Sequence, residues 1–106
     1  MISQEKIQEA IQRLVKAYDP VMIYFFGKYA WGTPDNDDDL NMLIIIDSSD
    51  EKASKRGYKA FTILFELEIP TSVTVCTKQE FDTFSQDPTT LTHEVKQRGK
   101  IVYARS

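Results

Sequence analysis

Four aspartates fall within residues 35–39, directly before the nearly all-apolar run of residues 40–46. Asp37 and Asp39 stand two residues apart, at the expected start of a strand. Because side chains two apart on a strand point to the same face, both carboxylates can bind one divalent cation. Mg²⁺ or Mn²⁺ is usually held by one or two carboxylates together with substrate phosphates. The spacing therefore predicts a metal site at Asp37 and Asp39, which are also the candidate catalytic residues.

A phosphate-binding turn is expected ten residues before Asp37. Gly27 ends an apolar run and Gly32 follows a short helical piece, so backbone N–H groups at a helix N-terminus would face an anion. Lys28 either adds a point charge for a phosphate oxygen or extends into solvent. Trp31 either stacks on a base or packs against the first helix. We expect phosphate groups to bind at Gly27, Lys28 and Gly32.

Hydrophobic periodicity predicts one domain over residues 1–106, of the α/β (α+β) class, with a mixed β-sheet of about four strands and helices packed against it. The expected helices cover residues 4–17, 51–67, 77–84 and 90–98, and the expected strands cover residues 21–26, 40–46, 71–76 and 100–104. Ser3 and the pair Thr77 and Glu80 should cap helices. The second helix should pack on the sheet through Tyr58, Phe61, Leu64 and Phe65.

Composition excludes several classes of protein. The net charge of −3 gives no broad basic surface for long nucleic acid. The single cysteine, Cys76, lies in an apolar strand, which favours a buried and inert thiol. No apolar run is long enough to span a membrane and the first residues show no signal peptide, so we expect a cytoplasmic protein.

The central segment resembles the minimal nucleotidyltransferase family of the DNA polymerase β superfamily. The signature of that family runs Gly-Ser, two to four residues, Gly, a variable loop, then Asp-x-Asp-Leu; the matching residues are Gly27, Ala30, Gly32, Pro34, Asp35, Asp37, Asp39 and Leu40. The likeness continues through Tyr18-Asp19-Pro20, Ile69-Pro70, the TKQEF segment from Thr77 to Phe81, and Arg98-Gly99-Lys100. It implies a nucleotidyltransferase-type fold and Mg²⁺-dependent transfer of a nucleoside monophosphate, with AMP expected, from ATP or another nucleoside triphosphate to a hydroxyl.

Two positions depart from the family pattern. Lys28 stands where the family has serine, and Ser72 stands where it places a third carboxylate. In the two-metal mechanism that the resemblance implies, this carboxylate completes the site of the metal that activates the attacking hydroxyl. Glu66 or Glu68 could compensate. The sequence leaves two functions open: an active nucleotidyltransferase, and a catalytically degenerate module of the same fold that binds a nucleotide or a partner.

Partners are expected for two reasons. The chain shows no second domain that would select an acceptor, and the resemblance implies a separately encoded helical protein of the HEPN kind, with this chain as the antitoxin half of the pair. Trp31, Tyr58, Phe61 and Phe65 also offer more apolar area than a small sheet covers. Self-association into a homo-oligomer would cover that area equally well.

Overall fold

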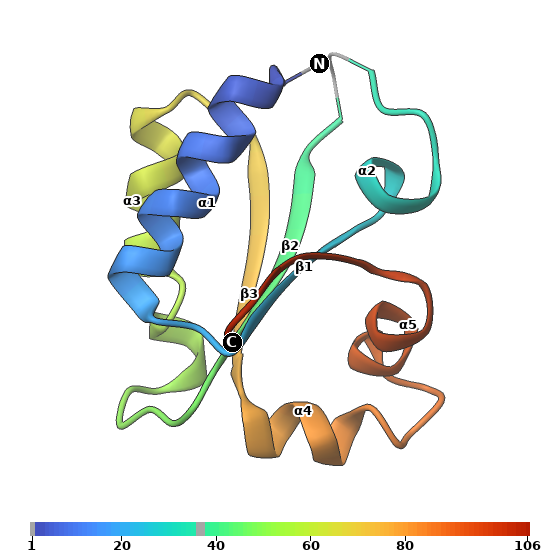
Figure 1. Cartoon of the computed structure of the whole chain (residues 1–106). Coiled ribbons are helices and arrows are strands. Elements are labelled where there is room, and N and C mark those ends of the chain that lie inside the picture. The colour runs from blue at the N-terminus through green and yellow to red at the C-terminus, as the bar shows by residue number, and fades with distance from the viewer. Residues whose placement is uncertain (1, 36–37) are drawn as a thin grey trace.

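One four-stranded sheet organises the chain, as a computed structural model of residues 2–35 and 38–106 shows (Figure 1). The elements follow in the order α1 (Gln4–Tyr18), β1 (Met22–Phe26), α2 (Lys28–Trp31), β2 (Leu40–Ile46), the 3₁₀ turn η1 (Ala53–Lys55), α3 (Tyr58–Glu66), β3 (Thr71–Thr77), α4 (Lys78–Phe84), α5 (Leu91–Arg98) and β4 (Lys100–Ala104). The strand order is β3-β2-β1-β4. β2 and β3 run parallel, while β1 runs antiparallel to both β2 and β4, so the predicted mixed sheet is confirmed.

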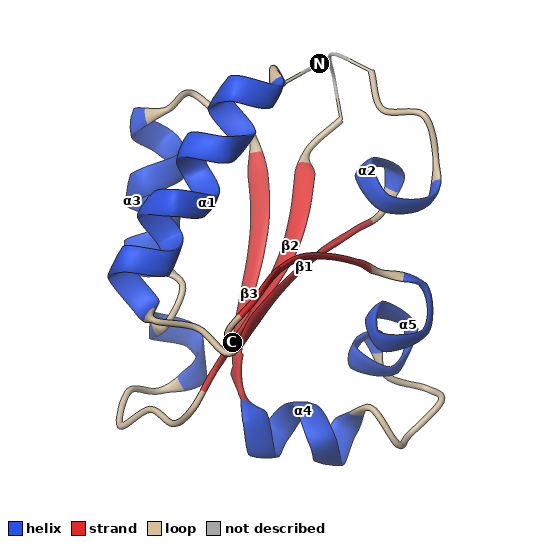
Figure 2. Ribbon diagram, viewed as in Figure 1, coloured by secondary structure: helices blue, strands red, loops and turns tan. Residues whose placement is uncertain are grey.

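Helices cover both faces of the sheet, with α1 and α3 on one side and α4 and α5 on the other (Figure 2). Alternate residues of β2 therefore enter two separate cores. Met42 and Ile44 pack with Leu14 of α1 and Leu64 of α3. The neighbours on the opposite face of the same strand pack with α4 and α5, in a cluster of Tyr24, Leu43, Ile45, Cys76, Phe81 and Val95. Burial on both faces explains why β2 is almost entirely apolar.

The predicted helix caps are present. The Ser3 hydroxyl accepts a hydrogen bond from the Lys6 N–H at the start of α1. Thr77 and Glu80 form a reciprocal capping box at the start of α4. These local signals place the ends of α1 and α4 close to where the sequence predicts them.

The predicted continuous helix over residues 51–67 is wrong. The chain forms the short turn η1 and then begins α3 at Tyr58, so Gly57 precedes the helix instead of lying inside it. Arg56 interrupts the helix because its side chain is buried and its guanidinium contacts both Glu80 carboxylate oxygens, at 2.6 and 3.4 Å.

The expected packing of α3 on the sheet is also only partly right. Leu64 is buried, and Ala60 occupies the other core position of the helix. Tyr58, Phe61 and Phe65 are instead largely exposed. Among the described residues, no helix is long and apolar enough to cross a membrane.

Candidate functional site

Gly27 makes the turn between β1 and α2. Its backbone has φ +77° and ψ −152°, a region that only glycine adopts readily. A Cβ at this position would lie 2.6 Å from Nδ2 of Asn41, so the turn excludes a side chain for a second reason. α2 begins at the next residue, as expected, and Gly32 ends it with its N–H donating to the Lys28 carbonyl at 3.1 Å.

The acidic loop lies beside this turn, but its carboxylates precede β2. The strand begins at Leu40, whose N–H donates to the Pro70 carbonyl at 2.9 Å. Asp39 is therefore the exposed residue directly before the strand and not a residue within it. Asp37 lies outside the described residues, so the shared orientation of Asp37 and Asp39 stays a prediction.

Asp38 joins the loop to the glycine turn. One carboxylate oxygen accepts a hydrogen bond from the Asp35 N–H at 2.8 Å, and the other lies 3.2 Å from the Lys28 ammonium. The Asp35 N–H, and then the Lys28 ammonium, hold the pKa of the Asp38 carboxyl below its ordinary value. Lys28 thus does more than extend into solvent: its charge is compensated by Asp38, and a phosphate group would compete with that carboxylate for it.

Asn41 belongs to the same site, although sequence reasoning missed it. It is the second residue of β2, with Phe26 of β1 and Ser72 of β3 as its neighbours across the sheet. Its side-chain amide lies against the Gly27 turn. The available signal was that Asn41 is the one polar residue in the run Leu40–Ile46. The register places this amide between the glycine turn and the Ser72 position.

Ser72 lies on the α4 and α5 side of the sheet and is exposed. The suggested substitutes for the missing carboxylate point elsewhere. Glu66 pairs with Arg13 of α1 at 3.3 Å, on the opposite side of the sheet. Glu68, held at φ +58°, instead lines a hollow beside α1, together with Lys6. The structure therefore brings neither glutamate to the Ser72 hydroxyl.

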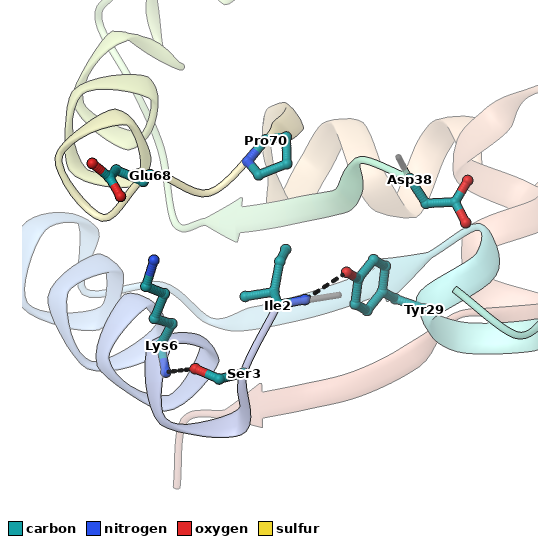
Figure 3. Close-up of a pocket in the computed structure, with 7 residues that line it drawn as sticks. All are labelled: Ile2, Ser3, Lys6, Tyr29, Asp38, Glu68 and Pro70. Atoms are coloured by element: carbon teal, nitrogen blue, oxygen red, sulfur yellow. Dashed lines mark hydrogen bonds between the residues drawn. The ribbon is translucent and has the colours of Figure 1, made fainter. Parts of the chain in front are cut away.

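A hollow of about 330 Å³ lies next to the site, at the amino ends of β2 and β3 (Figure 3). Asp38 and Glu68 stand at opposite ends of it in this view, and the Tyr29 hydroxyl accepts a hydrogen bond from the Ile2 N–H at 3.2 Å. The lining residues are Ile2, Ser3, Lys6, Tyr29, Asp38, Glu68 and Pro70. Their mixed charges would suit a polar group.

Trp31 of α2 contacts a side chain of α5. The Arg98 guanidinium lies over the Trp31 ring, 4.6 Å from its centroid, which is a cation–π contact. The ring is about one-third exposed and does not pack on α1, so that expectation is wrong. The contact holds the glycine turn against the α5 side of the molecule.

The oxygen ligands available at the candidate site suit one hard cation better than two. Within residues 2–35 and 38–106, no group of three or more His, Cys, Asp or Glu side chains is placed to hold a metal ion. Asp39, together with Asp37 and phosphate oxygens of a substrate, would be sufficient ligands for a single Mg²⁺. Ser72 offers a neutral hydroxyl where a second cation would need a carboxylate.

Comparisons with known proteins support the fold. The sequence matches no protein-family model and no curated protein. Among solved structures, the chain is similar to a protein from Sulfolobus solfataricus described as a "putative nucleotidyltransferase". The TM-score is 0.59 and the identity 16%, over 74% of this chain and 70% of that chain. The chain therefore has a nucleotidyltransferase-type fold, as the resemblance implied.

Proposed function

We propose that this chain binds a nucleoside triphosphate, ATP being the first candidate, and transfers its nucleoside monophosphate to a hydroxyl acceptor. The observation that supports this best is the contact between Lys28 and Asp38, 3.2 Å, which joins the glycine turn to the acidic loop at the amino end of β2. A cationic turn beside carboxylates is what a metal-bound triphosphate requires. The nucleotidyltransferase-type fold supports the same class of reaction.

Each residue of the site has a proposed role. The backbone of Gly27 and Gly32 would approach the phosphates closely, and Lys28 would exchange the Asp38 carboxylate for a phosphate oxygen. The Asn41 amide would hold the turn and orient the phosphate that lies nearest to it. Asp37 and Asp39 would hold Mg²⁺, which when bound would neutralise phosphate charge and favour attack at the α-phosphorus.

A second candidate is a nucleotide- or partner-binding module without turnover. Ser72 favours it, because its exposed hydroxyl lies opposite Asn41 where the proposed reaction needs a carboxylate to activate the acceptor. Binding of the triphosphate would survive this loss, since it depends on the turn and on Asp37 and Asp39. Transfer would slow severely.

The acceptor is proposed to belong to another molecule. In the antitoxin version of this proposal, a separately encoded helical protein of the HEPN kind provides the hydroxyl. Incubating the two proteins with Mg²⁺ and ATP labelled on its α-phosphate tests that version directly, because the β- and γ-phosphates leave as pyrophosphate. A labelled partner would support it, and an unlabelled partner in the presence of a bound nucleotide would count against it.

Titration calorimetry with Mg²⁺ and a non-hydrolysable ATP analogue tests the site itself. We expect Asp39→Asn and Lys28→Ala each to weaken binding at least tenfold, about 1.4 kcal/mol. Asp50→Asn, which removes an exposed carboxylate outside the site, is the matched control and should bind as the wild type does. Equal binding by all four proteins would refute the site.

Pyrophosphate release then separates the two candidate functions. Binding with release on addition of an acceptor supports the transferase, and binding without release supports the inactive module. Absence of nucleotide binding rejects the transferase and the nucleotide-binding form of the second candidate, and leaves only a partner-binding module.

A further inference from the structure

Three aromatic side chains form an exposed row along α3. Tyr58, Phe61 and Phe65 are 66%, 60% and 72% exposed, while Leu64 of the same helix is fully buried. The Phe61 and Phe65 rings stack with their centroids 6.1 Å apart. This aromatic row is therefore an ordered apolar surface, and such surfaces usually mark sites of association.

The aromatic row lies beside an unprotected sheet edge. Among the residues that the structure describes, β3 is the last strand in the sheet order, and its residues Thr71–Thr77 include no charge and no proline. Proteins usually protect an exposed edge with such residues, as β4 does with Lys100 at the opposite edge. A hollow of about 340 Å³ separates the row from the strand, lined by Gly57, Tyr58, Phe61, Thr71 and Val73.

The free edge of β3 indicates what kind of partner could bind there. Backbone N–H and C=O groups along the free edge of β3 need a strand as their partner, and a helix cannot supply one. We propose that this partner is a second copy of the chain. Its β3 pairs antiparallel with β3 of the first copy, about a two-fold axis near Thr74, so that the two sheets become continuous.

This arrangement also covers the aromatic rows. An antiparallel two-fold continuation of a sheet places the same face of both copies on one side, so the two α3 helices lie on the same side of the sheet and their rows meet across the axis. The three rings alone would bury on the order of 400 Å² on each copy. A specific interface buries about 800 Å² on each partner, and the strand edge and the hollow provide the remainder.

Charge favours the antiparallel direction. Glu68 lies just before β3 and Lys78 directly after it, and both are exposed. In an antiparallel pair, Lys78 of each copy lies near Glu68 of the other, whereas a parallel pair would bring like charges together. The strand centre would pair Val73 of each copy with Val75 of the other, on the side of the sheet that carries α3.

Sedimentation velocity from low to high micromolar concentration tests the proposal. The wild type should sediment as a dimer of the 12.2 kDa chain. Phe61→Glu should shift the dissociation constant at least a hundredfold, as should Tyr58→Lys, which guards against a folding defect in the first variant. Ile101→Glu, at an exposed apolar position on β4, is the matched control and should leave the dimer intact.

Thr74→Lys tests the strand pairing separately, because it places two ammonium groups at the two-fold axis without touching the aromatic row. It should weaken the dimer at least tenfold, while Gln79→Lys on the exposed side of α4 should not. A monomeric wild type would overturn the proposal and leave the row to a different protein. A dimer that Phe61→Glu disrupts and Thr74→Lys does not would overturn the strand pairing.

Discussion

Lys28 is the cation of the proposed phosphate-binding turn, and Asp38 compensates its charge in this structure. The pair lies at 3.2 Å, with the lysine side chain 58% exposed. Exposed ion pairs of this kind contribute little to stability, because solvent screens them. The contact therefore bears mainly on ligand binding, where the Asp38 carboxylate both occupies Lys28 and repels an incoming phosphate.

Asp38→Asn should tighten binding of a triphosphate. The amide oxygen of asparagine can still accept the Asp35 N–H, so the loop keeps its hydrogen bond, while Lys28 loses its anionic partner. We expect an affinity gain of about three- to tenfold, which corresponds to roughly 1 kcal/mol. Calorimetry in low salt is the measurement. Weaker binding by Asp38→Asn would show that Asp38 supports the ligand.

Ser72→Asp should restore an acceptor-activating carboxylate. Its side chain would lie on the same face as Asn41, because the two positions are register partners. Pyrophosphate release should rise at least tenfold, about 1.4 kcal/mol of transition-state stabilisation, with affinity for the triphosphate little changed. Thr83→Asp on α4 is the control for added charge. If Ser72→Asp leaves the rate unaltered, the site does not use a third carboxylate.

At the scale of elements, the regular helices and strands could be predicted and the acidic loop could not. The nearly continuous apolar run of β2, the apolar segment of β3 and the helical periodicity of α1 predicted these elements to within about two residues, because burial leaves a strong pattern. The loop before β2 has no such pattern. In its described part the Asp38 carboxylate accepts the Asp35 N–H, a contact that no spacing rule identifies.

The helix predicted over residues 51–67 failed for a related reason. The apolar spacing of Tyr58, Phe61 and Phe65 correctly predicts a helix. Periodicity alone does not show whether that face of the helix packs on the sheet or is exposed. Nor does it reveal that Arg56 enters the interior to meet Glu80 on a different helix. The ion pair joins residues 24 positions apart, which a periodic pattern does not relate.

The turn between β1 and α2 should tolerate no side chain at Gly27. Gly27→Ala meets a glycine-only backbone conformation and the Asn41 amide, so we expect a loss of about 2 kcal/mol and a melting temperature lower by on the order of 10 °C. Gly32→Ala is the matched control, because its Cβ would be 3.4 Å from the nearest atom. Differential scanning calorimetry would measure both melting temperatures. Equal melting temperatures of Gly27→Ala and Gly32→Ala would contradict the claim that only position 27 requires glycine.

The Arg56 to Glu80 pair should make stability depend on acid pH. The Arg56 guanidinium, and then the Thr77 N–H, hold the pKa of Glu80 below its ordinary value of 4.5. Stabilisation from this carboxylate is therefore present above about pH 4.5 and is lost as the pH falls through the lower value of the folded protein. Glu80→Gln should cost about 2 kcal/mol at neutral pH and much less in acid, as denaturant titrations at several pH values would show.

At the scale of the whole molecule, the proposed association surface and the candidate ligand site lie on opposite faces of the sheet. α1 and α3 close one core, and the aromatic row extends from that side toward the free edge of β3. The glycine turn, Asn41 and Ser72 belong to the other side, which α4 and α5 cover only in part. A dimer formed through β3 would therefore lie two strands away from the glycine turn, which follows β1, but directly beside Ser72.

The rate at which Cys76 reacts with a thiol reagent would report how often the core around it opens. Cys76 is the one cysteine of the chain, and burial in the α4 and α5 core, followed by the charge of Glu80, raises its pKa to about 12. A thiol reagent at neutral pH should then react slowly, and faster when that core opens. The labelling rate should fall when a triphosphate binds and should rise in Phe81→Ala, which removes a ring from the same cluster. Mass spectrometry of labelled protein over time would read these rare openings directly, with no engineered probe.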